Sequence, residues 1–180
     1  MGCGHSKNEA PKTREKFGES EKLTFLVFGM PDSGQTPFIK TMEKSFANTG
    51  GFNQNTVNFI AVSTDRSDRK KWVDEYTNQT NVIGSFFFVD VSSPSSALLS
   101  VKTFNWMMSQ LDDKDPPLVV GYVKTQNYSI NFKTLKDYLP PDIQTDQFIE
   151  TNQQDVQRLI DYVAKIIAKH TQANEGENQN

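Results

Sequence analysis

Hydrophobic and polar positions alternate in blocks along the chain. Short apolar runs, typical of buried strands, are separated by stretches whose apolar residues have helical spacing. The predicted strands cover residues 22–29, 57–62, 83–91, 116–123 and 147–150. The predicted helices cover residues 35–46, 97–111, 132–139 and 156–170, and residues 68–76 are predicted to form a polar helix or a turn. This alternation predicts an α/β fold with a mainly parallel sheet flanked by helices, because each parallel connection needs a helix-length crossover.

Length and composition limit the number of domains and the kinds of partner. A chain of 180 residues has room for one domain, and we expect it at 21–171, between a flexible N-terminal tail, 1–20, and a polar C-terminal tail, 172–180. A net charge of −3 gives no broad positive field, so we expect no nucleic-acid partner. One cysteine and two histidines cannot complete a Cys/His zinc site.

The first residues carry a lipidation pattern. The start MGCGHS matches M-G-x-x-x-[ST], with Gly2 as the myristate acceptor after Met1 is removed. One myristoyl chain binds membranes weakly, so we expect a second acylation at Cys3, the only cysteine. The alternative is an ordinary N-terminus in which both residues occur by chance. The lipid interpretation predicts the cytoplasmic face of a membrane, with the plasma membrane as the favoured one.

A glycine-bounded loop follows the first predicted strand. Residues 29–36, GMPDSGQT, fit the phosphate-loop frame GxxxxGK[ST] except that Gln35 replaces the lysine. Backbone N–H groups and the next helix N-terminus hold phosphates in such loops, and the hydroxyl binds magnesium. Without the lysine charge, nucleotide affinity should fall at least about tenfold. The alternative is a simple turn. The candidate nucleotide-binding residues are Gly29, Asp32, Ser33, Gly34, Gln35 and Thr36, with Thr36 as the magnesium ligand.

Three segments resemble heterotrimeric G-protein alpha subunits. Their first strand, phosphate loop and first helix resemble residues 22–44, KLTFLVFGMPDSGQTPFIKTMEK. Their switch II resembles residues 66–72, RSDRKKW, and their last helix resembles residues 156–170, VQRLIDYVAKIIAKH. The resemblance implies a P-loop NTPase fold, a Ras-like G domain from which the family's helical domain is absent. For RSDRKKW the alternative is a solvated charged helix. The family's switch II binds beta-gamma subunits and effectors, which implies the partner-binding residues Arg66, Arg69, Lys70, Lys71 and Trp72.

Other positions depart from the family pattern. The family's DVGGQ falls on residues 61–65, AVSTD, which lack the magnesium-side acid and the water-orienting glutamine. NKxD falls on residues 123–126, VKTQ, without the aspartate that reads guanine, and TCAT falls on residues 148–151, FIET. No arginine stands near the compressed switch I region at 48–51. We therefore expect GTP or GDP with Mg²⁺ to bind weakly at most, with very slow hydrolysis or none.

Two functional hypotheses follow from the resemblance. The favoured one is a membrane-anchored, G-protein alpha-like signalling protein, a pseudo-GTPase that acts through partner binding rather than through its nucleotide. The second is an active small GTPase of the ADP-ribosylation-factor-like type that tolerates glutamine in the loop. Titration with GTP, GDP and ATP separates the two, because a working switch requires tight guanine-nucleotide binding.

Overall fold

The computed structural model describes residues 22–47, 57–63, 65–78, 81–111, 116–123 and 132–177. The predicted lipid acceptors Gly2 and Cys3 lie outside the described residues. So do the switch I stretch at 48–51 and residues 124–126 of the NKxD alignment. Arg66 is described by its backbone alone.

Strands and helices alternate as the hydrophobic pattern predicts. The strands are β1 (Leu23–Gly29), β2 (Val57–Ala61), β3 (Val82–Asp90), β4 (Leu118–Tyr122) and β5 (Thr145–Phe148). The helices are α1 (Gln35–Ala47), the 3-10 turn η1 (Arg66–Asp68), α2 (Arg69–Asn78), α3 (Pro94–Met108), α4 (Phe132–Lys136) and α5 (Gln153–Glu177).

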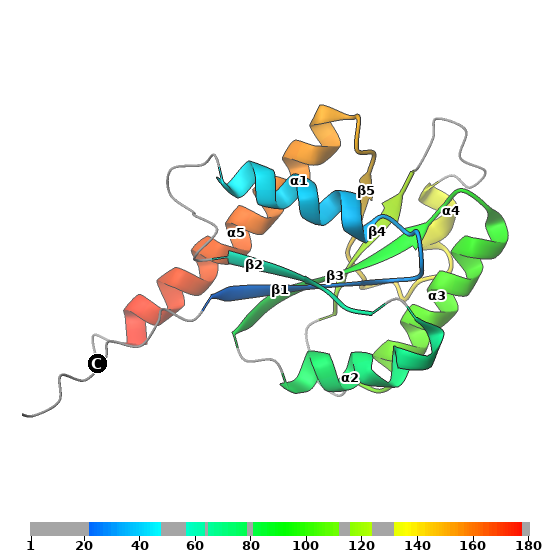
Figure 1. The fold of residues 1–180 in the computed structure, drawn as a ribbon, viewed down its shortest axis with the longest axis horizontal. Helices are drawn as coiled ribbons and strands as arrows, with labels where there is room; N and C mark the ends of the chain where they lie inside the picture. The colour runs from blue at the N-terminus through cyan, green and yellow to red at the C-terminus, as the bar shows by residue number, and fades with distance from the viewer. Residues whose placement is uncertain are drawn as a thin grey trace, which may run out of the picture.

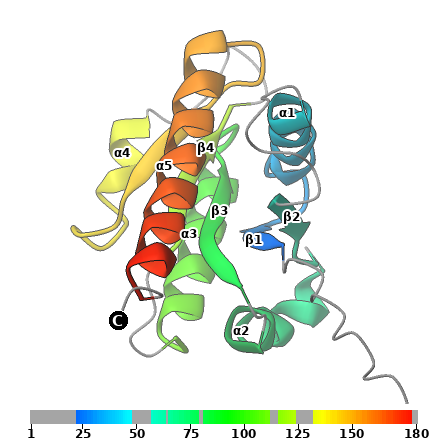
Figure 2. The same cartoon turned by 90° about the vertical axis from the view of Figure 1, so that its left-hand side faces the viewer.

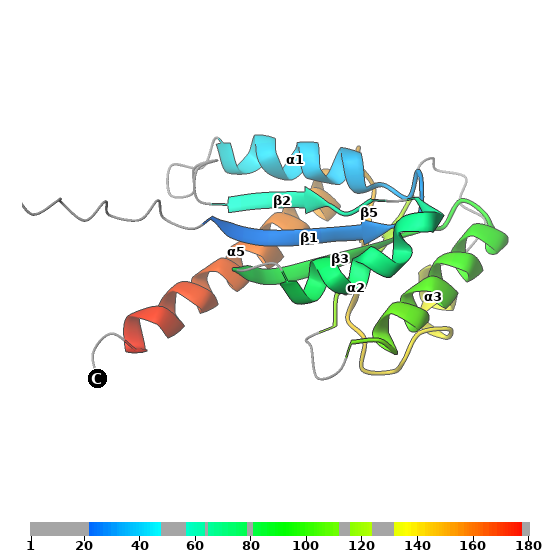
Figure 3. The ribbon, with the colours of Figure 1, turned by 60° about the horizontal axis from the view of Figure 1, so that its bottom comes forward.

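The strands form one parallel sheet in the order β2-β1-β3-β4-β5 (Figure 1). Helices α1 and α5 cover one face, and α2 and α3 cover the other (Figures 2 and 3). The predicted α/β fold with a mainly parallel sheet is therefore confirmed at this level. The order is compatible with both Rossmann-like and P-loop folds.

Several helix ends differ from the sequence prediction by three residues or more, and the two clearest cases are the start of α3 and the end of α5. Helix α3 begins at Pro94 rather than at residue 97, because Ser93 caps it: its hydroxyl accepts a hydrogen bond from Ser96 N at 3.1 Å. Helix α5 continues to Glu177, into the predicted polar tail at 172–180. No proline interrupts this stretch, so the backbone hydrogen bonds extend past the last apolar residues.

Phenylalanine rings fill the layer between the sheet and helices α1 and α5. Phe38 of α1 lies 4.9 Å from both Phe86 and Phe88 of β3, measured between ring centroids, and 5.8 Å from Phe148 of β5. All four rings are fully buried. This packing fixes the start of α1 above the ends of the strands.

Within the described residues, no helix is long and apolar enough to span a bilayer.

Candidate functional site

The candidate site lies at the carboxyl ends of the strands, beside β1. The sheet order places β2 on one side of β1 and β3 on the other, so the connections after β1 and β2 run in opposite directions. In open parallel sheets, ligands bind in the crevice at such a switch point. The loop between β1 and α1, which carries the predicted phosphate-loop residues, is located there.

The backbone of this loop turns sharply from strand to helix. Ser33 N donates to Met30 O at 3.2 Å and closes a turn, and Phe38 N donates to Gly34 O at the same distance to begin α1. Asp32 and Gly34 have positive φ values of 60° and 105°. Aspartate tolerates this region and glycine favours it. The predicted strand, glycine turn and helix are therefore present.

Protein side chains occupy the inner side of the loop. Ser33 is fully buried and Gln35 is 4% exposed. The Ser33 hydroxyl lies 2.7 Å from Met30 O and 2.9 Å from Gln35 Oε1, although it has one proton for the two acceptors. Gln35 Nε2 has no hydrogen-bond partner among the described residues. Position 35, where the phosphate-loop frame predicts a lysine, thus holds a neutral, buried amide that is incompletely hydrogen-bonded.

Tyr122, at the end of β4, covers Gly34. A Cβ atom on Gly34 would overlap the Tyr122 ring, so the close approach and the positive φ both require glycine. Tyr122 is 7% exposed and stacks on Phe148 with centroids 6.0 Å apart. Burial raises the pKa of Tyr122, and the negative charges of Glu150 and Asp90 raise it further. Two carboxylates, those of Glu150 and Asp90, therefore act on the phenol group that covers the loop.

A cavity of about 300 Å³, the loop cavity, lies over the turn. None of the described residues that line it is basic, and no group of three His, Cys, Asp or Glu suited to a metal occurs in the described part of the chain. The predicted magnesium ligand Thr36 is exposed and lines the cavity. Ala61, the position where the resemblance predicted the loss of a metal-side acid, lines the same cavity. These residues do not fit a tightly held Mg²⁺–triphosphate. The lining residues are Pro31, Asp32, Gly34, Gln35, Thr36, Pro37, Ala61 and Tyr122.

The switch II-like segment begins with a network of short hydrogen bonds. Asp65 caps η1 by accepting from Ser67 N at 2.9 Å. Lys71 pairs with Asp68 at 2.7 Å, and Ser63 donates to the same carboxylate at 2.9 Å. Lys71 and Ser63 lower the pKa of Asp68, and Asp68 in turn raises the pKa of Lys71. The charged side chains of this turn therefore face solvent but are partly neutralised.

Trp72 is a core residue, which corrects its assignment to the partner surface. Its ring is fully buried and lies 5.8 Å from Phe28 and 5.9 Å from Phe87, measured between centroids. Its Nε1 donates to Ser63 O at 2.7 Å. The sequence expectation failed because a tryptophan within a charged segment can point either way on a helix. Here the predicted partner residues Arg69, Lys70 and Lys71 face outward or lie half-buried, and Trp72 points inward.

A surface groove between α2 and α3 brings two of the predicted partner residues, Arg69 and Lys70, together with α3 residues that the sequence prediction did not select. Leu99 is 49% exposed and Trp106 is 38% exposed, which is unusual for side chains of this size. Arg69, Lys70 and Lys102 line the same hollow of about 380 Å³, together with Thr103. We name it the α2–α3 groove. Its sequence signal is weak: α3 contains no acidic residue, and its apolar residues are too many for one face.

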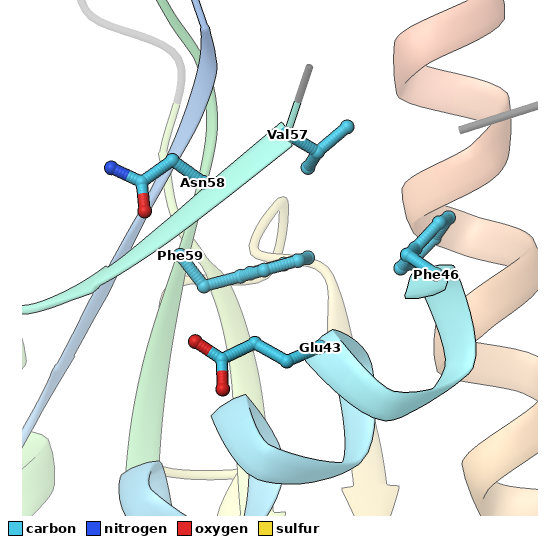
Figure 4. Close-up of a pocket in the computed structure, with 5 residues that line it drawn as sticks. All are labelled: Glu43, Phe46, Val57, Asn58 and Phe59. Carbon is cyan, nitrogen blue, oxygen red and sulfur yellow. The ribbon is translucent and has the colours of Figure 1, made fainter. Parts of the chain in front are cut away.

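A second hollow lies at the other end of α1, against the edge strand β2 (Figure 4). Its volume is about 270 Å³. The close-up shows the Glu43 carboxylate on the α1 side and Asn58 on the β2 side, with the Phe59 ring between them. Glu43 is the only ionisable residue that lines it within the described part of the chain. This arrangement does not indicate catalysis.

Arg69 connects the groove to the loop. Its Nη2 donates to Met30 Sδ at 3.0 Å, across from α2 to the turn that follows β1. The two candidate regions are therefore adjacent.

No protein-family model matches the chain, and no curated protein matches its sequence.

Proposed function

We propose that this chain is a membrane-anchored, G-protein alpha-like signalling protein with a Ras-like, P-loop-type domain. In this proposal its GTP binding and hydrolysis are weak or lost, and it acts mainly by binding other proteins. The positions aligned with the family's sequence motifs support it. Ala61 lines the loop cavity beside Thr36, Val123 directly follows Tyr122 of that cavity, and Phe148 packs on Tyr122. Three aligned segments thus converge on the loop after β1.

Loss of nucleotide chemistry is supported by the side chains at that site. Phosphoryl transfer depends on positive charges and on metal ligands placed around the transferred group. Gln35 is neutral and buried, Ala61 has no carboxylate, and Tyr122 covers Gly34. Glu150 and Asp90 add negative charge at the same edge of the sheet. A triphosphate would meet repulsion where the family provides attraction.

The α2–α3 groove is the observation that carries the partner-binding proposal. Two exposed apolar side chains, Leu99 and Trp106, are flanked by the positive charges of Arg69, Lys70 and Lys102. Lys70 and Lys102 form no ion pair within the described part of the chain. Buried tryptophans dominate binding energy at interfaces, and surface charges steer association. The groove therefore suits an acidic protein surface with apolar anchors.

The partner in this proposal is a beta-gamma dimer or an effector protein. The basic residues Arg66, Arg69, Lys70 and Lys71 lie on one continuous segment, η1 and the start of α2, and Lys102 of α3 lines the same groove as Arg69 and Lys70. Myristate on Gly2 and a second acyl chain on Cys3 would hold the protein at the cytoplasmic face of the plasma membrane. Both lipids would raise the local concentration of a membrane-bound partner.

Charge reversal tests the partner site. The double variant Lys70→Glu, Lys102→Glu should weaken binding of a purified beta-gamma dimer by at least about tenfold, because two steering charges become repulsive. The matched control is Lys40→Glu, Lys165→Glu, which makes the same charge change at exposed positions on α1 and α5. Equal affinities for both double variants and the parent, measured by surface plasmon resonance, would reject the groove.

Isothermal titration of the purified chain with GTP, GDP and ATP in magnesium tests the nucleotide site. We expect weak binding or none, and Gln35→Lys alone should not restore tight binding because the metal-side acid is also missing. Tight, guanine-specific binding by the parent would favour the active-GTPase hypothesis. Gly2→Ala tests the anchor separately: the variant should leave the membrane pellet on sedimentation, and full retention would exclude lipid attachment through Gly2.

A further inference from the structure

Helix α3 carries apolar side chains on its outer side as well as on the side that packs on the sheet. Ala97 and Phe104 are buried in the core against the sheet. On the outer side Leu98 is 44% exposed, in addition to the exposed Leu99 and Trp106 of the α2–α3 groove. A helix that is apolar on all sides is normally covered on all sides, so the outer side of α3 is a candidate contact surface.

Four exposed side chains form one stripe along the outer side of this helix. At about 100° per residue, Leu98, Lys102, Trp106 and Leu99 lie within an arc of about 100°. We name these four residues the α3 face. Lys102 is the only ionisable residue of the whole helix, whose sequence is PSSALLSVKTFNWMM. The α3 face therefore combines three apolar side chains with one positive charge and no acidic residue.

The α2–α3 groove does not account for the whole α3 face. Leu99, Lys102 and Trp106 line the groove, but Leu98 does not. A partner seated in the groove alone would therefore leave Leu98 in water. Figure 3 shows α3 beside α2 on the outside of the sheet, so a flat surface that lies along α3 can reach the complete stripe.

We propose that the α3 face docks on an anionic membrane surface. The Leu98, Leu99 and Trp106 side chains enter the interfacial layer of the lipid, where leucine and tryptophan of amphipathic helices are bound and tryptophan is enriched. Lys102 lies in the headgroup layer, because its long stem contacts the neighbouring apolar side chains while its ammonium group reaches acidic headgroups.

The distribution of charge favours a lipid surface that is acidic. The chain as a whole has a net charge of −3, so an acidic surface does not attract it through its overall charge. Lys70 and Lys102 lie beside each other in the lining of the groove and form no ion pair within the described part of the chain. These two charges attract acidic headgroups locally and turn α3 towards the membrane.

Docking in this orientation would also regulate the α2–α3 groove. Three of the four residues of the α3 face line the groove, so the membrane would cover them. A protein partner could bind there only after the face has left the lipid surface. This consequence rests on the proposed partner function, whereas the docking itself does not depend on it.

Vesicle sedimentation tests the docking with the full, unacylated chain, which separates the α3 face from the proposed lipid anchor. We expect binding to vesicles of phosphatidylcholine with about one third phosphatidylserine, and binding to phosphatidylcholine alone should be at least about tenfold weaker. Lys70→Glu, Lys102→Glu should weaken binding to the acidic vesicles by at least about tenfold. The matched control Lys40→Glu, Lys165→Glu, on α1 and α5, should weaken it by less than about threefold.

Leu98 separates membrane docking from partner binding. Leu98→Ser should weaken binding to the acidic vesicles by about threefold or more, because less apolar surface enters the lipid. The control Tyr138→Ser removes a ring that is 55% exposed outside α3 and should leave vesicle binding unchanged. Leu98→Ser should also leave the affinity for a beta-gamma dimer unchanged. Loss of that affinity with unchanged vesicle binding would overturn the proposal and assign Leu98 to a protein interface.

Quenching of tryptophan fluorescence by brominated lipids locates the contact. The chain has two tryptophans, of which Trp72 is fully buried and Trp106 lies on the α3 face. Acidic vesicles with brominated acyl chains should quench the parent, and Trp106→Phe should keep most of the vesicle binding but lose the quenching. The absence of a preference for acidic vesicles, equal losses in the two charge variants, or binding without quenching would each overturn the proposal.

Discussion

Replacement of Trp72 by alanine should destabilise the whole domain rather than remove a partner contact. The ring is fully buried against Phe28 and Phe87, so about 150 to 250 Å² of apolar surface is withdrawn from water. At about 25 cal/mol per Å² this corresponds to about 4 to 6 kcal/mol of unfolding free energy. The Nε1 hydrogen bond to Ser63 O adds about 1 kcal/mol. We expect a total loss of about 4 to 5 kcal/mol, because partial collapse of the cavity recovers part of this sum.

Urea unfolding followed by circular dichroism measures this loss directly. A domain of this size has a stability of about 5 to 15 kcal/mol, so Trp72→Ala should be close to unfolding in the absence of urea. The control Trp106→Ala removes the same side chain from a position that is 38% exposed, so it gives up less buried apolar surface and should cost less than Trp72→Ala. A loss below about 1 kcal/mol for Trp72→Ala, with weakened partner binding, would refute the core assignment and restore the sequence interpretation.

Three further predictions concern the loop and its cover. Gly34→Ala should lower the unfolding free energy by about 2 kcal/mol or more, measured by urea unfolding, because φ at this position is 105° and the new Cβ would meet the Tyr122 ring. Adding Tyr122→Ala removes that ring, so the double variant should recover part of the loss. The pKa of Tyr122 is raised in the folded state, so the stability that its neutral phenol contributes is complete below pH 10 and is lost as pH rises through the folded pKa. The unfolding free energy of Tyr122→Phe should therefore fall less steeply at alkaline pH than that of the parent. An identical fall in both proteins would contradict the raised pKa. Gln35→Met should change the unfolding free energy by less than about 1 kcal/mol, because it removes a buried amide whose nitrogen has no hydrogen-bond partner among the described residues. A loss of about 3 kcal/mol would instead show that all hydrogen bonds of this amide are satisfied.

The order of the elements could be predicted from the sequence because it depends on local patterns. Apolar runs such as SFFFV in β3 and the glycine-bounded turn at 29–36 have few alternatives, and the structure places strand, loop and helix at those residues. The start of α3 is also a local feature: Ser93 caps the helix and Pro94 occupies its first turn, so residues 93–96 alone carry this signal.

The surface properties of the candidate sites could not be predicted in the same way. Trp72 and Trp106 both stand in helical segments with polar neighbours, yet one is fully buried and the other is 38% exposed. The difference depends on which side of each helix meets the sheet. The contact between Tyr122 and Gly34 joins residues far apart in the sequence, and no local pattern marks it.

The sequence by itself determined the alternation of strands and helices, the position of the glycine-bounded loop and the neutral glutamine within it, since each of these is a property of neighbouring residues. Only the tertiary structure decided that Ser33 and Gln35 fill the loop, that Tyr122 covers it, and that Leu99 and Trp106 remain on the surface beside three basic side chains. Burial and exposure arise where segments from different parts of the chain meet, and hydrophobic periodicity within a single segment does not contain that information.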